Sequence, residues 1–233
     1  MTDTAGPAAI AHPDAQTDRP LDDRAWFSRL RGAFVVFDGP DGSGKSTQFS
    51  RFMGECAAAG LTVCDVREPG GTAIGERIRD ILLDASAGEM SARCEMLLYM
   101  ASRAQLVEER IKPALERGEL VLADRFVSST LAYQGAAGGI PDEDIHAVAA
   151  AACTGVTPDL VVIFDADEDT ASARVGDSRD RIESRGTGYR ARVREGYLKQ
   201  IAADPARCVR IDAAPAPDTV AEAVLDAVYA RFA

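Results

Sequence analysis

A glycine-rich segment in the first third of the chain has the residue types and spacing of a phosphate-binding loop. Its glycines can turn backbone N–H groups toward an anion, and its lysine supplies a mobile positive charge. The serine after the lysine offers an oxygen ligand of the kind that Mg²⁺ prefers. The segment fits G-x-x-x-x-G-K-[ST] at every fixed position, and with the next residue it comprises Gly39, Pro40, Asp41, Gly42, Ser43, Gly44, Lys45, Ser46 and Thr47. We therefore expect it to bind the phosphates of a nucleoside triphosphate together with Mg²⁺.

Short apolar runs alternate with segments of helical spacing along the rest of the chain. The runs lack the polar alternation of half-exposed strands, which is typical of strands buried on both faces. Parallel strands need crossover connections, so the alternation predicts an α/β fold with a doubly wound parallel sheet of about five strands and helices on both faces. The expected strands are residues 33–37, 61–66, 120–123, 160–164 and 208–211. The expected helices are residues 47–59, 92–117, 145–152, 170–175, 189–203 and 217–231.

Composition and charge argue against several classes of protein. The 233 residues carry a formal net charge of −11, which disfavours binding to nucleic acid. No apolar run approaches the roughly 18 residues of a membrane span, and the N-terminus lacks the apolar stretch of a signal peptide. The five cysteines are dispersed without a CxxC pair, so we expect reduced thiols in a cytoplasmic protein and no metal bound by cysteine.

The first 30 residues differ in composition from the rest of the chain. Residues 1–20 are rich in Ala, Pro, Thr and Asp and have no apolar periodicity, which is typical of a disordered extension. A short amphipathic helix is possible over residues 21–30 through Trp26, Phe27 and Leu30. We expect one folded domain over residues 31–233, and the sequence indicates no role for the extension.

A phosphate-binding loop alone does not distinguish a kinase from a motor ATPase or a GTPase. The guanine-binding element N-K-x-D is missing from the sequence, and the third expected strand is followed by Asp124-Arg125 instead of an acidic pair. An aspartate followed by an arginine suits a site in which a cation meets a second phosphate group, so the acceptor is expected to carry a phosphate. Two alternatives stay open: another nucleotide or deoxynucleoside kinase of the same fold, and a non-enzymatic nucleotide-dependent switch.

Four further segments, taken with the loop, closely resemble the bacterial thymidylate kinases. They are the REPGGT run at residues 67–72, LYMASRAQ at 98–105, the block from DRF at 124–126 to YQG at 133–135, and DRIE at 180–183. Their order along the chain is the order found in that family. The resemblance implies the fold of P-loop nucleoside monophosphate kinases, ATP and dTMP as substrates, dTDP as product, Mg²⁺ as cofactor and a homodimer.

The same resemblance implies roles for residues near the phosphate and sugar of dTMP. Arg125 would hold the acceptor phosphate, with Arg67 nearby. Asp41 would reach the 3′-hydroxyl and help to place the metal, partly through water. Tyr133 would crowd the 2′ position and exclude ribose. Pro69 would follow a cis peptide bond, as it does in the family.

Four residues are expected around the base. Tyr99 would stack on thymine, and Arg103, which shares a helix face with it at i, i+4 spacing, would hydrogen-bond the base. Thr130 and Gln134 are further candidates on the base side. The family comparison also places Asp38 where many bacterial relatives have Glu.

Several of these residues have a structural alternative. Tyr99 could be a core aromatic, and Arg103 could pair with a structural carboxylate, which a buried arginine requires. Arg67 could form a surface pair with Glu68, and Asp124–Arg125 could be a salt bridge at the end of a strand.

The expected catalytic groups are cations. The oxygen of an acceptor phosphate is already ionised near neutral pH, so no general base is required, and Lys45 with Arg125, Asp41 and Mg²⁺ should hold the reactants. Relatives supply a further arginine from the phosphate loop or from a lid, and the loop here has none. Residues 176–188 are charged and glycine-bearing, which indicates a lid. In it, Arg181 is our first choice for the catalytic arginine and Arg179 our second.

Overall fold

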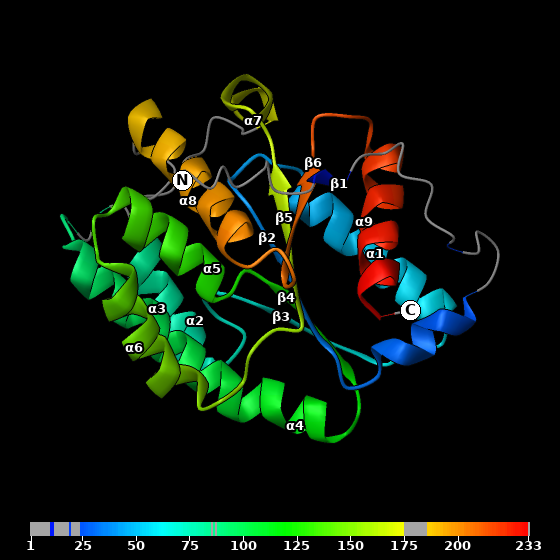
Figure 1. Ribbon diagram of the computed structural model, residues 1–233. Helices are drawn as coiled ribbons and strands as arrows, with labels where there is room; N and C mark the ends of the chain where they lie inside the picture. The colour runs from blue at the N-terminus through cyan, green and yellow to red at the C-terminus, as the bar shows by residue number, and fades with distance from the viewer. Residues whose placement is uncertain are drawn as a thin grey trace, which may run out of the picture.

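A parallel β-sheet forms the centre of the computed structural model, which describes residues 10–11, 19, 24–84, 86, 88–174 and 186–232. Its six strands run in the order β1-β6-β5-β2-β4-β3, and every neighbouring pair is parallel (Figure 1). The strands are β1 (Ile10–Ala11), β2 (Phe34–Asp38), β3 (Val63–Arg67), β4 (Leu120–Asp124), β5 (Leu160–Asp165) and β6 (Cys208–Asp212). The five predicted strands are confirmed, and β1 adds two residues at the edge beside β6.

Helices connect consecutive strands and cover both faces of the sheet. They are α1 (Lys45–Ala58), α2 (Ala73–Leu83), α3 (Ala92–Leu106), α4 (Lys112–Glu116), α5 (Val127–Thr130), α6 (Asp142–Cys153), α7 (Glu168–Arg174), α8 (Thr187–Ala203) and α9 (Pro217–Phe232). A 3₁₀ helix, η1 (Ala25–Leu30), and two π-helical segments, η2 (Val107–Ile111) and η3 (Leu131–Ala137), complete the described elements. None of the described helices is both long and apolar enough to cross a lipid bilayer.

The predicted helices are present, with three differences. The segment predicted as one helix over residues 92–117 is α3, η2 and α4 in immediate succession. Neither α2 nor the α5–η3 segment was predicted. Thr72 begins α2 as its N-cap, because its hydroxyl accepts a hydrogen bond from the Gly75 N–H at 2.9 Å.

Alternate residues of the central strand β2 face two separate cores. Val35 and Phe37 pack in a core with residues of α1 and α9, whereas Phe34 and Val36 pack in another with residues of η2, η3 and α8. Figure 1 shows α1 and α9 on one side of the sheet and α3, α4, α6 and α8 on the other. This two-sided burial explains the unbroken apolar run at residues 33–37 and confirms the doubly wound arrangement.

Parts of the first 30 residues lie against the domain. Trp26 in η1 is buried and its ring meets Tyr229 of α9 edge-on at a centroid distance of 5.4 Å. Phe27 contacts Phe52 of α1. Arg19 forms ion pairs with two carboxylates of α9, Glu222 and Asp226. These contacts fasten the start of the folded chain to α1 and α9, on the face of the sheet away from α8.

Candidate active site

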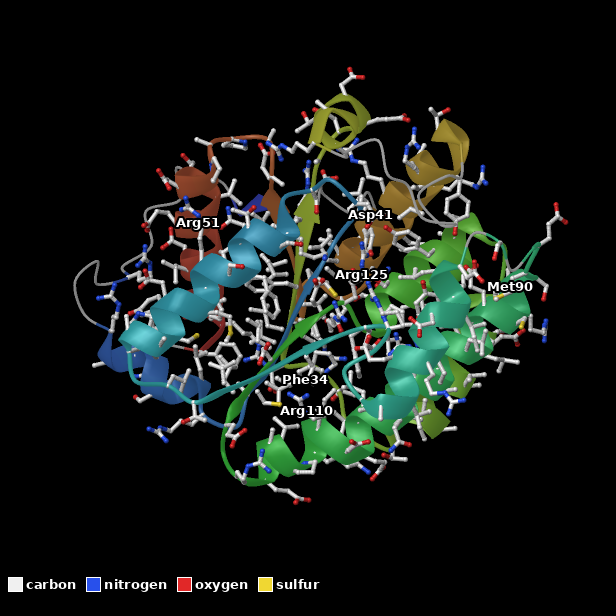
Figure 2. All side chains as sticks on the ribbon, turned by 180° about the vertical axis from the view of Figure 1, so that it is seen from behind. Phe34, Asp41, Arg51, Met90, Arg110 and Arg125 are labelled. Atoms are coloured by element: carbon white, nitrogen blue, oxygen red, sulfur yellow. The ribbon has the colours of Figure 1, made fainter. Side chains whose placement is uncertain are left out.

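Three loops that could bind a ligand leave the sheet at the same edge. The phosphate loop follows β2, the REPGGT segment begins at the end of β3, and Asp124-Arg125 lies at the end of β4, which stands between β2 and β3. Figure 2 shows Asp41 and Arg125 beside each other, whereas Phe34 marks the opposite end of β2. The carboxyl edge of an open parallel sheet is where such folds bind ligands.

The phosphate loop has the backbone geometry that its glycines allow. Gly39 has φ 147°, and a β-carbon there would lie 2.5 Å from the carbonyl oxygen of Phe164, so glycine is required. Gly44 has φ 80° and caps α1, which begins at Lys45. The first turn of a helix presents unpaired N–H groups and a positive dipole end, which suits a phosphate. Ser46 and Thr47 are exposed in this turn.

Lys45 points from the loop toward the end of β4. Its side chain is buried, and Nζ forms an ion pair with Oδ1 of Asp124. Burial lowers the pKa of Lys45, and the neighbouring Arg125 guanidinium lowers it further, against the opposing effect of Asp124. Asp124 therefore pairs with Lys45 and not with Arg125, so the strand-end salt bridge considered as an alternative does not form.

Arg125 is held by groups from several elements. Its Nη1 donates to the Gly39 carbonyl at 3.0 Å and to Ser129 Oγ at 3.0 Å. Its Nη2 pairs with Asp41 Oδ1, and its guanidinium lies 5.2 Å from the ring centre of Tyr133. Arg125 also has φ 72°, a left-handed backbone that costs a non-glycine residue about 1–3 kcal/mol and clusters at functional sites.

A cavity of about 190 Å³ lies between these groups. Its lining includes Lys45 and six of the eight residues predicted on the dTMP side, and the whole lining comprises Asp41, Lys45, Tyr99, Arg125, Thr130, Tyr133 and Gln134, together with Glu68, Pro69, Arg79, Leu83 and Ser129. Tyr133 donates its hydroxyl to Asp41 Oδ2 at 3.0 Å, which joins the sugar-side candidates to one another. The Glu68–Pro69 peptide bond is cis, as the resemblance implies.

Arg103 is not among the residues that line this cavity. It is 1% exposed, and its Nε donates to Glu68 Oε2 at 2.7 Å. Its Nη1 donates to Thr130 Oγ1 at 3.2 Å, so the arginine contacts a residue that lines the cavity without lining it itself. The structural carboxylate considered as an alternative partner is therefore Glu68. Burial raises the pKa of Glu68 to about 7, although the Arg103 charge opposes this.

Of the other arginines predicted at the site, the structure describes only Arg67. Arg67 is exposed, lies 3.2 Å from Glu76 and does not line the cavity. Because Glu68 pairs with Arg103, the Arg67–Glu68 surface pair does not form. Arg179 and Arg181 lie outside the described residues. Arg174, just before them, donates to the Ala213 carbonyl at 2.8 Å, and its Nη1 lies 3.7 Å from where a β-carbon on Gly44 would stand.

The sequence did not point to three polar residues behind Arg125. Asp38, Ser129 and Tyr197 contact one another and Arg125 through hydrogen bonds. Asp38 could have been found, because a carboxylate directly before a phosphate loop has no place in a buried apolar strand without a partner. Ser129 and Tyr197 gave no such signal, since Tyr197 falls in the apolar stripe of its helix.

The fold, with Lys45 and Arg125 at one cavity, defines a P-loop nucleoside monophosphate kinase. A family model described as thymidylate kinase matches residues 37–224. The chain therefore belongs to the thymidylate kinase family. Thymidylate kinases from Exiguobacterium sp. and Solidesulfovibrio magneticus are 43% and 44% identical over 205 and 200 residues, which cover 87% and 82% of this chain and 97% and 96% of theirs. A crystal structure of thymidylate kinase from Ehrlichia chaffeensis is similar with a TM-score of 0.69 and 29% identity, covering 85% of this chain and 98% of that one.

Proposed function

We propose that this chain transfers the γ-phosphoryl group of ATP to dTMP, giving ADP and dTDP. One observation carries the proposal: Lys45 from the phosphate loop and Arg125 from the end of β4 line the same cavity. Transfer between two phosphates needs a cation for each reactant, because the charge that spreads over the transferred group must be neutralised while both are held in line. A site for a triphosphate alone would not require the second cation.

The donor side of the proposal rests on the loop. The backbone of residues 39–47 and the start of α1 would surround the ATP phosphates, and Lys45 would follow the β- and γ-phosphates. Lys45 is already held at the cavity by Asp124.

The oxygen groups beside the loop suit a Mg²⁺ ion that is shared with the nucleotide phosphates. They suit less well a metal site made of protein side chains alone. Among the described residues, no cluster of three or more His, Cys, Asp or Glu could hold a metal ion. The exposed Ser46 hydroxyl and the Asp41 carboxylate, the latter partly through water, would share the ion with the nucleotide phosphates. Bound there, Mg²⁺ would neutralise phosphate charge.

The acceptor side is proposed to hold dTMP through Arg125, Asp41 and Tyr133. Arg125 would bind the phosphate, and Arg67 would be a more distant positive charge. Asp41, which Arg125 and Tyr133 both contact, would accept a hydrogen bond from the 3′-hydroxyl of dTMP. The Tyr133 ring beside Arg125 would fill the space that a ribose 2′-hydroxyl needs.

The base is proposed to lie between Tyr99 and Gln134. The Gln134 Nε2 donates to Glu95 Oε1 at 2.7 Å, which leaves its amide oxygen to accept the N3–H of thymine. Tyr99, which lines the cavity, would stack on the ring. Arg103 would contribute with Thr130, to which it already donates. We retain Arg181, and second to it Arg179, as the proposed arginine that stabilises the transition state.

We also propose that the protein is a homodimer that works in the cytoplasm. Among the described residues, large apolar side chains that remain exposed are Ile74 (53%), Ile81 (50%) and Leu97 (50%). They lie on α2 and α3, which pack against each other, and exposed apolar side chains on these two helices support an interface there. All five cysteines are free thiols, which supports a reducing compartment. A shift from dimer to monomer mass in Leu97→Asp would support the interface, and an unchanged mass would contradict it.

One assay tests the proposed reaction. ADP release from ATP is measured in parallel with dTMP, dUMP, dCMP, UMP and no acceptor. We expect dTMP to be the best acceptor and dUMP to be about 10- to 100-fold worse in kcat/KM, because one methyl group is worth about 1–3 kcal/mol. A higher rate with another nucleotide would assign a different kinase of this fold. Slow ADP release that no acceptor accelerates would favour a nucleotide-dependent switch.

A further inference from the structure

The hydroxyl of Tyr197 lies in the interior, behind Arg125. Tyr197 of α8 is 1% exposed, and its hydroxyl donates to Asp38 Oδ1 at 2.7 Å. The same oxygen lies 3.3 Å from Arg125 Nη1 and 3.1 Å from Ser129 Oγ. Val193 and Ile201, one turn away on either side, are buried in the same core, so the ring itself is an ordinary core contact. The hydroxyl, in contrast, has polar partners from three other parts of the chain.

Asp38 is the group that these partners share. It ends β2, is completely buried, and accepts hydrogen bonds from the Gly39 N–H, from both serines of α5 and from Tyr197. A buried carboxylate needs such donors and a counter-charge, and Arg125 Nη1 at 3.4 Å supplies the charge. Asp38 therefore fixes the Tyr197 hydroxyl in one orientation, with its proton toward the carboxylate and its lone pairs toward Arg125. Burial and the Asp38 charge raise the pKa of Tyr197 well above its usual range, so the hydroxyl keeps this proton.

The two ends of the Arg125 guanidinium have different surroundings. Nη1 meets the Gly39 carbonyl, Ser129 Oγ and the Tyr197 hydroxyl, all of them fixed by buried structure. Nη2 meets Asp41, a residue that lines the cavity. Figure 2 shows Arg125 directed toward Asp41. One end of the guanidinium is thus an anchor, and the other, paired with Asp41, faces the cavity.

We propose that Tyr197 is a positioning residue for Arg125. The Tyr197 hydroxyl, oriented by Asp38, accepts a hydrogen bond from Arg125 Nη1. This contact sets the direction in which the opposite end of the guanidinium meets the acceptor phosphate. The inference rests on the proposed function, since it takes the phosphate of the acceptor as the ligand of Arg125. Tyr197 does not line the cavity, so it acts through the arginine and not on the substrate. If only the ring of Tyr197 mattered, loss of its hydroxyl would not change the binding of the acceptor phosphate.

Binding measurements separate these two roles. In Tyr197→Phe the ring stays and the hydroxyl is lost, and Tyr229→Phe on α9, across the sheet, is the matched control. Calorimetry with dTMP, with thymidine and with ATP is carried out on each protein. We expect Tyr197→Phe to weaken dTMP about tenfold, the size of a lost hydrogen bond to a charged group, while thymidine and ATP bind as in the wild type. Equal weakening of thymidine and dTMP, or no change for dTMP, would overturn the inference.

A second measurement tests whether the effect passes through Arg125. Tyr197→Phe is introduced into an Arg125→Met background, and the change in dTMP affinity is compared with the change in the wild-type background. We expect less than about a twofold effect once the arginine is absent, because nothing remains to be positioned. A loss of about tenfold in both backgrounds would show an independent structural role and would overturn the inference.

The two proposals fail in different ways. If the wild type does not bind dTMP, the proposed function fails together with the premise of this inference. If the wild type binds dTMP and Tyr197→Phe binds it equally well, the inference alone fails.

Discussion

The sides of the cavity that we propose for the donor and for the acceptor are built in opposite ways. The phosphate loop is one stretch of nine residues, and glycines such as Gly39 and Gly44 set its geometry through the backbone. The acceptor side is assembled from side chains, because Arg125 is fixed by Asp38 and by Tyr197, which lies 159 positions from Asp38 in the chain. The first kind of site is encoded locally, whereas the second depends on how the sheet and α8 pack.

This difference has a consequence for substitutions. Changes in distant buried residues such as Tyr197 should alter the binding of dTMP and leave the binding of ATP intact. The donor side should respond only to changes in or directly beside the loop, such as Lys45 and its partner Asp124.

The largest expected effect is a loss of kcat on removing an arginine of the predicted lid, which belongs to neither the donor side nor the acceptor side. Arg181→Ala should lower kcat by about a thousandfold or more, as loss of a transition-state arginine does in phosphoryl transfer, while ATP affinity stays close to the wild type. Arg185→Ala, in the same segment, is the matched control. Steady-state kinetics and ATP binding measure both. An unchanged kcat in Arg181→Ala would contradict the role of Arg181 and leave Arg179 as the candidate for the transition-state arginine.

The next effect tests the separation of the two sides directly. Arg125→Ala should weaken dTMP about a hundredfold and leave ATP binding unchanged, because it removes a charge-assisted contact to phosphate. Lys45→Ala should weaken ATP to a similar degree and leave thymidine binding unchanged. Titration calorimetry gives the four affinities: those of Arg125→Ala for dTMP and ATP, and those of Lys45→Ala for ATP and thymidine. Parallel losses of both ligands in either variant would contradict the separation.

A smaller effect concerns the sugar. Tyr133→Ala should raise the relative kcat/KM for ribo-thymidylate about tenfold, because it removes the ring that we propose excludes the 2′-hydroxyl. Tyr133→Phe keeps the ring and serves as the control, and it should keep the deoxy/ribo ratio of the wild type. The ratio is measured with both acceptors at saturating ATP. A ratio that does not change in Tyr133→Ala would remove this role.

The smallest effect is a pH dependence on the base side. Glu68 has a pKa near 7, so its carboxylate protonates as the pH falls through that value and Arg103 loses its partner. Thymidine has no phosphate to titrate, and its affinity should fall about three- to tenfold from about pH 8 to about pH 6. Glu68→Gln cannot titrate and should give a flat profile. A flat wild-type profile, or the same slope in the variant, would contradict this role of Glu68.

The sequence predicts the centre of the sheet well because β2, β4 and β5 are buried on both faces and therefore appear as unbroken apolar runs. The runs at β3 and β6 are interrupted by Asp65 and Arg210, because these strands are more exposed. The sequence does not predict α5–η3, whose run of small and polar residues has no apolar stripe, nor the π-helical segment η2 within the long helix. Contiguous motifs indicate Lys45, Asp41 and Arg125. The pairing of Arg103 with Glu68 and the contact of Tyr197 with Asp38 depend on residues 35 and 159 positions apart, which local patterns do not connect.

The central claim is that two phosphate sites, one on the loop and one at Arg125, face each other across a single cavity. A molecule that joins adenosine to thymidine through a chain of phosphates tests this most directly, because linkage makes the second contact intramolecular. We predict that it displaces both ATP and dTMP in competition titrations, binds more tightly than either, and loses its advantage in Arg125→Ala. Displacement of ATP alone, with dTMP still bound, would contradict the account.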